Sequence, residues 1–187
     1  ATASPGLPLD RARNILLNNS EYNEAKTTLA STPEGVGIGT HCLCNAKCVF
    51  CLGGKTNFFS LKRYKEFFKP RLGRVISNAR FVNFCGFGEL LLMPGIEDFL
   101  DYVNKKIPEV NKIYTTNGYP LMNKKVLERL VETVSAVGIS LHASGSSLHR
   151  LLTKTDTFEQ IISGIKQLVS LRKRKGHPTI NLVFLIN

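Results

Sequence analysis

Hydrophobic residues along this chain follow two alternating patterns. Short apolar runs of strand-like composition predict β-strands at residues 35–40, 81–84, 112–116, 136–141 and 179–186. Apolar residues at helical spacing predict helices at 9–18, 21–29, 61–68, 72–78, 95–107, 124–133 and 158–173. Asn123 is a suitable N-cap for the helix at 124–133, and Gly176 is suited to end the last helix.

The alternation of strands and helices predicts an α/β fold with a parallel sheet and right-handed crossovers. Residues 1–34 precede the regular pattern and are expected to form an N-terminal helical extension, with a core domain at 35–187. The last predicted strand is strongly apolar and no helix follows it, so its edge would be exposed. We therefore expect either a fold truncated after the fifth strand or a partner that covers that edge.

Each of the first four predicted strands is followed by a distinctive polar segment. These are a cysteine cluster at 42–51, a glycine-containing loop at 86–89, the pair Asn117-Gly118, and residues 142–147. Because the carboxyl ends of parallel strands lie at one edge of the sheet, where α/β proteins bind their ligands, these segments are predicted to share one active site.

The chain has five cysteines, and the clustered ones are Cys42, Cys44, Cys48 and Cys51. Counted from Cys44, the spacing is C-x3-C-x2-C, with Phe50 directly before the last cysteine. Three thiolates on one short loop can bind three corners of an iron–sulfur cubane and leave the fourth iron open, unlike the four-cysteine electron-transfer clusters. Such crowding also differs from a disulfide framework and indicates a metal site in a reducing compartment. Cys42 and Cys85 are expected to be buried residues rather than ligands.

A zinc site made by all four clustered cysteines is the main alternative. Structural zinc sites commonly use two pairs of ligands separated by a dozen or more residues, which this cluster does not provide. A ferredoxin-type cluster is disfavoured because its spacing differs and no proline follows the last cysteine. The zinc hypothesis corresponds to a non-enzymatic, zinc-stabilised nucleic-acid-binding module.

The cysteine spacing, with its aromatic residue before Cys51, resembles the signature of the radical S-adenosylmethionine (radical SAM) superfamily, and the resemblance extends over about residues 35–187. It implies a partial (β/α)6 TIM-like barrel, with a [4Fe–4S] cluster bound by Cys44, Cys48 and Cys51 and S-adenosylmethionine (SAM) on the open iron. In that family the reduced cluster cleaves SAM to methionine and a 5′-deoxyadenosyl radical, which abstracts a hydrogen atom from substrate. An electron donor such as flavodoxin or ferredoxin is also implied.

The segment Gly86-Phe87-Gly88-Glu89 resembles the Gly-Gly-Glu motif with which the family holds the amino group of SAM. Glycines allow the backbone to approach a ligand closely, and Glu89 offers an acceptor for an ammonium group. The resemblance further implies that Thr116 or Asn117 faces SAM, although Asn117-Gly118 is also a favoured turn.

Further SAM contacts are implied near the later strands. Ser140 and His142 share one face of the fourth strand and would lie near the ribose and the methionine carboxylate, although a core position is the other interpretation of His142. Arg150 resembles the basic residue that pairs with the carboxylate, and a solvent-exposed helix arginine is equally consistent. Asn187 would lie near SAM at the end of the fifth strand, and the adenine near Phe50.

Composition bears on location and partners. No apolar stretch in the 187 residues is long enough to span a bilayer, and the first residues lack the features of a signal peptide, so we expect a cytoplasmic protein without membrane contact. The net charge of +11 indicates attraction to anionic partners such as RNA, phosphorylated substrates or acidic peptides. The densest basic run, 172–175, is interpreted as a solvated helix end.

The sequence leaves the substrate open between two enzymatic hypotheses. The strand and helix pattern resembles members that mature peptides and the member that acts in molybdenum-cofactor synthesis, which favours a peptide or small metabolite. RNA modification by a methyltransferase-like enzyme is the alternative that the basic charge supports. The sequence does not decide between an oxidoreductase and a transferase.

Overall fold

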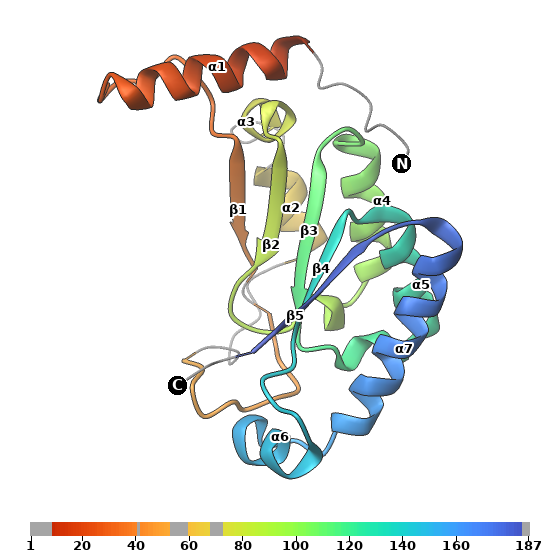
Figure 1. Ribbon diagram of the computed structural model, residues 1–187. Helices are drawn as coiled ribbons and strands as arrows, with labels where there is room; N and C mark the ends of the chain where they lie inside the picture. The colour runs from red at the N-terminus through yellow and green to blue at the C-terminus, as the bar shows by residue number, and fades with distance from the viewer. Residues whose placement is uncertain (1–8, 41, 53–59, 68–72, 185–187) are drawn as a thin grey trace.

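The computed structural model describes residues 9–40, 42–52, 60–67 and 73–184. Its centre is a single five-stranded sheet in which every neighbouring pair of strands is parallel and the strands lie in chain order (Figure 1). The strands are β1 (Gly35–Gly39), β2 (Phe81–Cys85), β3 (Asn111–Thr116), β4 (Ala136–Ser140) and β5 (Thr179–Val183). Parallel strands in sequential order are the arrangement of a TIM-like barrel, so the predicted α/β class and partial barrel are confirmed.

Helices fill the connections between these strands. The α-helices are α1 (Leu9–Asn23), α2 (Leu61–Phe67), α3 (Gly73–Asn78), α4 (Ile96–Lys106), α5 (Lys124–Thr133), α6 (Ser146–Thr153) and α7 (Phe158–Lys175). Two short 3-10 helices, η2 (Leu90–Leu92) and η3 (Tyr119–Met122), follow β2 and β3. The Asn123 carboxamide caps α5 by accepting from the N–H groups of Lys125 (3.0 Å) and Val126 (3.4 Å). Gly176, in the left-handed conformation, ends α7 as predicted.

The N-terminal region differs from the sequence prediction. Instead of two helices at 9–18 and 21–29, one helix, α1, runs through residues 18–20, where neither glycine nor proline interrupts it. Glu21 lies inside this helix, and its carboxylate accepts hydrogen bonds from the Ala30 and Ser31 N–H groups at 2.7 and 3.1 Å. These bonds fold residues 24–31 back along the helix.

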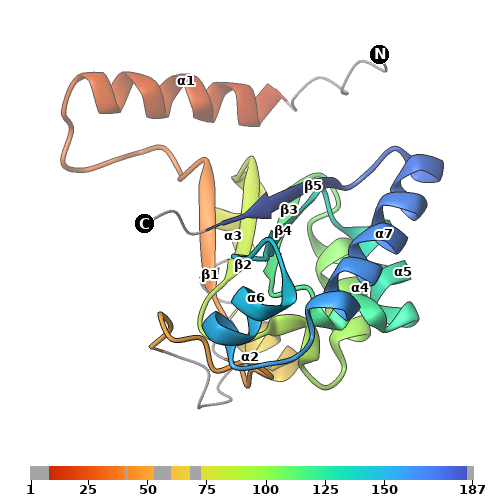
Figure 2. The same cartoon turned by 60° about the horizontal axis from the view of Figure 1, so that its bottom comes forward.

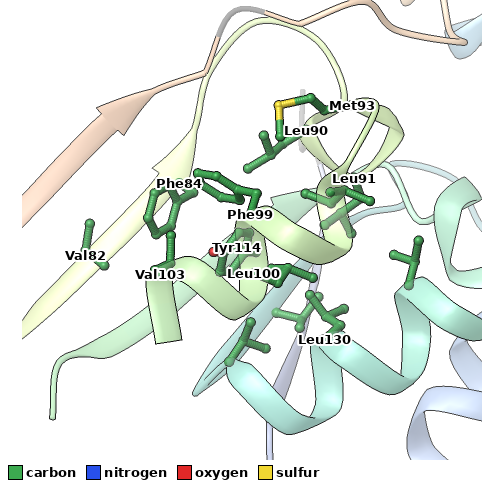
Figure 3. Packing of buried hydrophobic residues seen from close by; sticks show 14 of the residues in the cluster. Val82, Phe84, Leu90, Leu91, Met93, Phe99, Leu100, Val103, Tyr114 and Leu130 are labelled. Carbon is green, nitrogen blue, oxygen red and sulfur yellow. The ribbon is translucent and has the colours of Figure 1, made fainter. Parts of the chain in front are cut away.

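The core lies between the sheet and the helices α4 and α5 (Figure 3). Phe84 of β2 stacks on Tyr114 of β3 with ring centroids 4.8 Å apart and meets the edge of Phe99 from α4 at 5.4 Å. All three side chains are at most 1% exposed. Burying aromatic rings of this size, together with the aliphatic side chains around them, stabilises the packing of the helical layer on the sheet.

The opposite face of the sheet is more open and more polar. Helices α4, α5 and α7 lie along one side of the sheet (Figure 2). Side chains alternate along a strand, so the residues next to the buried ones in β2 and β4 point away from the helical layer. Among them, Asn83, Cys85 and Ser140 are only half-buried. Polar groups therefore collect on this face towards the carboxyl ends of the strands. In the described ranges no helix has the length and apolar character needed to cross a bilayer.

Candidate active site

A cavity of about 440 Å³ opens at the carboxyl ends of the strands. Its wall combines the three cysteines of the C-x3-C-x2-C motif with residues from each of the polar segments that follow β1 to β4. The predicted residues among its lining are Cys44, Cys48, Phe50, Cys51, Gly86, Gly88, Glu89, Thr116, Asn117, Ser140 and His142. The volume lies within the range of small-molecule and cofactor sites.

The cysteine loop is held by backbone hydrogen bonds on two sides. Pairing between β1 and β2 continues past the strands, where the Cys42 N–H donates to the Phe87 carbonyl (2.9 Å) and the Glu89 N–H donates to the Leu43 carbonyl (3.1 Å). Farther along, the N–H groups of Lys47 and Val49 donate to carbonyls at the end of α6, at 2.9 and 2.8 Å. The loop is thus positioned by the protein backbone itself.

The three thiols of the motif are free and face the same cavity. Burial raises the pKa of Cys44, and burial followed by the neighbouring Cys44 and Cys51 raises the pKa of Cys48. Two donors point at the Cys44 Sγ: the Ala46 N–H at 3.5 Å and the Asn117 carboxamide at 3.7 Å. Such donors stabilise a thiolate once a metal has displaced its proton.

The candidate donors are the three motif thiols that line the cavity. Within the described residues, no three Cys, His, Asp or Glu side chains converge closely enough to ligate one metal ion. A cubane binds each thiolate at a different iron, so its ligands lie farther apart than those of one ion. Cys42, which the zinc alternative requires, is 2% exposed and packs in the hydrophobic core, as the sequence predicted.

The two glycines of the Gly-x-Gly-Glu segment allow it to pack against the cysteine loop. Gly88 has a φ of +108°, and a Cβ there would lie 1.9 Å from the Cys42 carbonyl oxygen. A Cβ on Gly86 would lie 2.5 Å from the Thr40 carbonyl oxygen. The sequence predicted a close approach to a ligand, and the structure shows a close approach to the loop that carries the cysteines.

Glu89 links three segments beneath the cavity. Its Oε1 accepts from the Leu91 N–H (3.1 Å) and the Thr116 hydroxyl (2.9 Å), and its Oε2 accepts from the Asn117 N–H (2.6 Å). A carboxylate oxygen accepts two hydrogen bonds, so Oε2 has one acceptor position that no described residue occupies. Burial raises the pKa of Glu89 to about 7, against the lowering effect of these three hydrogen bonds.

This raised pKa predicts a pH dependence of stability in the metal-free chain. Because the folded-state pKa lies above the unfolded value of 4.5, the folded chain binds a proton more tightly than the unfolded chain. The Glu89 contribution is therefore full below pH 4.5 and is lost as the pH rises through about 7. We expect the free energy of unfolding, measured in urea, to fall over this range more steeply than in Glu89→Gln. Parallel pH profiles for the two proteins would contradict the assignment.

Aromatic and amide groups also line the cavity. The rings of Phe50 and His142 meet edge to face, with centroids 5.0 Å apart. His142 has a φ of +54° just past the end of β4, and burial lowers the pKa of its imidazole, which favours the neutral ring. The Asn117 carboxamide donates to Asn45 Oδ1 at 2.8 Å and ties the third strand to the cysteine loop.

Comparison with known proteins decides the family. The family model described as the Radical SAM superfamily matches residues 40–187, which is most of the chain. The chain belongs to the Radical SAM superfamily. This is a superfamily of enzymes whose cofactors are SAM and a [4Fe–4S] cluster, and the family model begins just before the cysteine loop described above.

Curated Radical SAM relatives match part of their length. The chain is 25% identical over 135 residues to the GTP 3′,8-cyclase of Campylobacter fetus subsp. fetus (strain 82-40), covering 68% of this chain and 40% of that protein. It is 28% identical over 127 residues to the GTP 3′,8-cyclase of Petrotoga mobilis (strain DSM 10674 / SJ95), covering 66% of this chain and 39% of that protein. The chain therefore spans about two fifths of the length of these relatives.

Solved Radical SAM structures share the fold. Streptococcus suis SuiB bound to the precursor peptide SuiA has a TM-score of 0.64 at 20% identity, covering 97% of this chain and 39% of that chain. The enzyme anSMEcpe with bound AdoMet (SAM) and the Kp18Cys peptide has a TM-score of 0.61 at 21% identity, covering 81% and 43%. These likenesses support the partial TIM-like barrel.

Some predicted residues do not reach the cavity. Arg150 is exposed on α6 and is not part of the lining, because the cavity-facing side of this helix carries His149 and Thr153 instead. The Phe87 side chain is 47% exposed and also outside the lining, although its carbonyl holds Cys42. Asn187 lies outside the described residues. Cys85 lines the cavity instead of joining the core, because it sits on the open face of β2.

A row of hydroxyl groups in the lining was missed by the sequence analysis. Thr153 donates to the His149 carbonyl at 2.8 Å, the Thr153 and Thr155 hydroxyls are 2.9 Å apart, and those of Thr155 and Thr157 are 3.0 Å apart. Because the Thr153 hydroxyl donates its proton to that carbonyl, the Thr155 hydroxyl donates to Thr153 and the Thr157 hydroxyl donates to Thr155. The Thr157 oxygen is then left as a hydrogen-bond acceptor. The alternating threonines at 153, 155 and 157 were the signal available in the sequence.

Proposed function

We propose that this chain binds a [4Fe–4S] cluster through Cys44, Cys48 and Cys51 and cleaves SAM reductively in the cavity at the carboxyl ends of the strands. The observation that carries the proposal is the placement of all three motif cysteines in one cavity with Glu89. When bound, the cluster supplies the electron that converts SAM to methionine and a 5′-deoxyadenosyl radical for hydrogen abstraction.

The residues of the chain itself would bind and orient SAM. The open acceptor position on Glu89 Oε2 suits the ammonium group of SAM, and the ionised carboxylate strengthens that hydrogen bond. Phe50 and His142 offer ring faces and edges for the adenine and its ribose, with Ser140 nearby on β4. Asn117 would hold the cysteine loop in register with these groups.

The substrate class that we propose is a peptide or a small metabolite. Support comes from both kinds of comparison, since the curated relatives are GTP 3′,8-cyclases and two of the similar structures contain peptides. RNA modification is kept as a second candidate, because a net charge of +11 would attract RNA. The free state of all five cysteines suits a reducing compartment such as the cytoplasm.

Anaerobic reconstitution with iron and sulfide, followed by reduction in the presence of SAM, tests the function. We expect about four irons per chain and formation of 5′-deoxyadenosine. Both should be lost in Cys48→Ala and retained in the matched control Cys85→Ala, because Cys85 lines the cavity outside the motif. Zinc without labile sulfide would overturn the proposal and favour the zinc-stabilised binding module.

A further inference from the structure

The outer side of the cysteine loop is joined to the last turn of α6. The N–H groups of Lys47 and Val49, on either side of Cys48, donate to the carbonyls of Thr153 and Leu152 at 2.9 and 2.8 Å. Figures 1 and 2 show the loop and α6 side by side. The surface of this helix end therefore adjoins the loop on both sides of the central cysteine of the motif.

This surface has an apolar centre and a cationic edge. Val49 and Leu151 are 59% and 60% exposed, and Lys47, Arg150 and Lys154 are exposed beside them. Arg150, Leu151 and Lys154 line a shallow depression. We call these five residues the α6 surface.

Basic residues outnumber acidic ones at this place. Neither 40–52 nor 141–155 contains Asp or Glu, and the nearest acidic residue in the sequence is Asp156, two positions after Lys154. Among the ion pairs between described residues, none involves the basic residues of the α6 surface. An apolar centre with a charged rim is the usual anatomy of a protein interface.

We propose that the α6 surface docks an acidic one-electron donor protein that reduces the cluster. This inference rests on the proposed function, which consumes one electron from outside for each SAM cleaved. The donor protein loses that electron, the cluster gains it, and no atom is transferred. Electron transfer weakens steeply with distance, so a donor must dock close to the cysteine loop, and the α6 surface lies against it.

The charge and the size of the surface fit such a partner. Electron-transfer complexes use small, transient interfaces, which a single helix end can provide. Complementary charge accelerates their association and makes it sensitive to salt. The exposed Val49 and Leu151 distinguish the surface from a simple phosphate-binding patch, since apolar side chains gain nothing from a nucleic-acid backbone.

The test compares Arg150→Glu/Lys154→Glu with the control Arg80→Glu/Lys105→Glu. The control makes the same charge change at two exposed positions, Arg80 just before β2 and Lys105 at the end of α4. Both lie towards the amino ends of the strands, away from the cysteine loop. The probe is an acidic flavodoxin, and its Kd is measured by calorimetry at low and high salt. We expect the Kd to rise about 10-fold or more in the first variant at low salt and to be unchanged in the control.

The second readout is the rate of 5′-deoxyadenosine formation with two reductants. With prereduced flavodoxin the rate should fall at least several-fold in Arg150→Glu/Lys154→Glu, while with dithionite it should equal that of the unmodified chain. The milder pair Arg150→Gln/Lys154→Asn should show a smaller change in the same direction. Asn suits position 154, which has a φ of +58°.

Several results would overturn the proposal. If Arg150→Glu/Lys154→Glu binds flavodoxin with unchanged affinity, the α6 surface is not the docking site. If the same variant loses the dithionite-driven rate, Arg150 acts in SAM binding instead of docking. Lost affinity for an RNA oligonucleotide, with flavodoxin binding retained, makes the surface an RNA site. Absence of dithionite-driven cleavage in the unmodified chain contradicts the proposed function alone. The affinity of the chain as purified still tests the docking in that case.

Discussion

Replacing Gly88 with alanine is expected to lower the free energy of unfolding by about 3 kcal/mol or more and to prevent cluster binding. The new Cβ would lie 1.9 Å from the Cys42 carbonyl oxygen, which is a backbone atom and cannot rotate away. Alanine would also have to keep a φ of +108°, which L-residues rarely adopt. Relief requires the glycine segment and the cysteine loop to separate, which breaks the hydrogen bond from Cys42 to Phe87.

The matched control for this variant is Gly37→Ala in β1. A Cβ on Gly37 meets nothing within 4 Å, and alanine restricts the unfolded chain, so stability should be unchanged or higher by up to about 1 kcal/mol. Chemical denaturation of the metal-free chains and iron content after reconstitution check both variants. Equal iron content in Gly88→Ala and the unmodified chain would contradict the assigned role of this contact.

Replacing Glu89 with alanine is expected to weaken SAM binding by about 10- to 100-fold, because a hydrogen bond to a charged group contributes about 1.5–3 kcal/mol. The same change leaves the Leu91 N–H, the Thr116 hydroxyl and the Asn117 N–H without their acceptor. Each unsatisfied donor costs about 1–3 kcal/mol, and removing a buried charge offsets part of that cost. The free energy of unfolding should therefore fall by about 2 kcal/mol or more. Calorimetric titration of the reconstituted protein with SAM measures the first effect and urea denaturation the second.

Two further variants separate the roles of Glu89. Glu89→Gln keeps an acceptor oxygen but loses the charge, so its affinity for SAM should lie between those of the unmodified chain and Glu89→Ala. Thr116→Val removes one donor to the carboxylate and leaves the Oε2 position intact, so SAM binding should change little. Unchanged SAM affinity in a folded Glu89→Ala would show that the ammonium group binds elsewhere.

The parts of this site that local patterns encode were predicted from the sequence. The cysteine spacing and the strand that precedes it are contained in one short segment, and the structure brings Cys44, Cys48 and Cys51 into the cavity as expected. Parallel strands in chain order then place the residues after β2, β3 and β4 on the same edge. For this reason the segments that contain Glu89, Asn117 and His142 could be predicted to lie together, and the resemblance to the family then pointed to these residues within them.

The parts that depend on three-dimensional packing were not predictable in the same way. Arg150 and His149 are adjacent in the sequence, and only the docking of α6 on the cysteine loop decides which of them faces the cavity. The structural role of Gly88 depends on a carbonyl 46 positions earlier. Cys85 was assigned to the core by residue type, whereas the alternation of β2 turns it towards the open face.

The order of the strands has a consequence for how the protein is made. Because each strand pairs only with its neighbours in the chain, the sheet can grow by adding one strand at a time from the N-terminal side. Every described residue that lines the cavity lies between Thr40 and Ile161, ahead of β5. A nascent chain that has emerged as far as Ile161 already carries this whole wall. The cysteine loop can therefore be in place on the ribosome before the last strand has emerged.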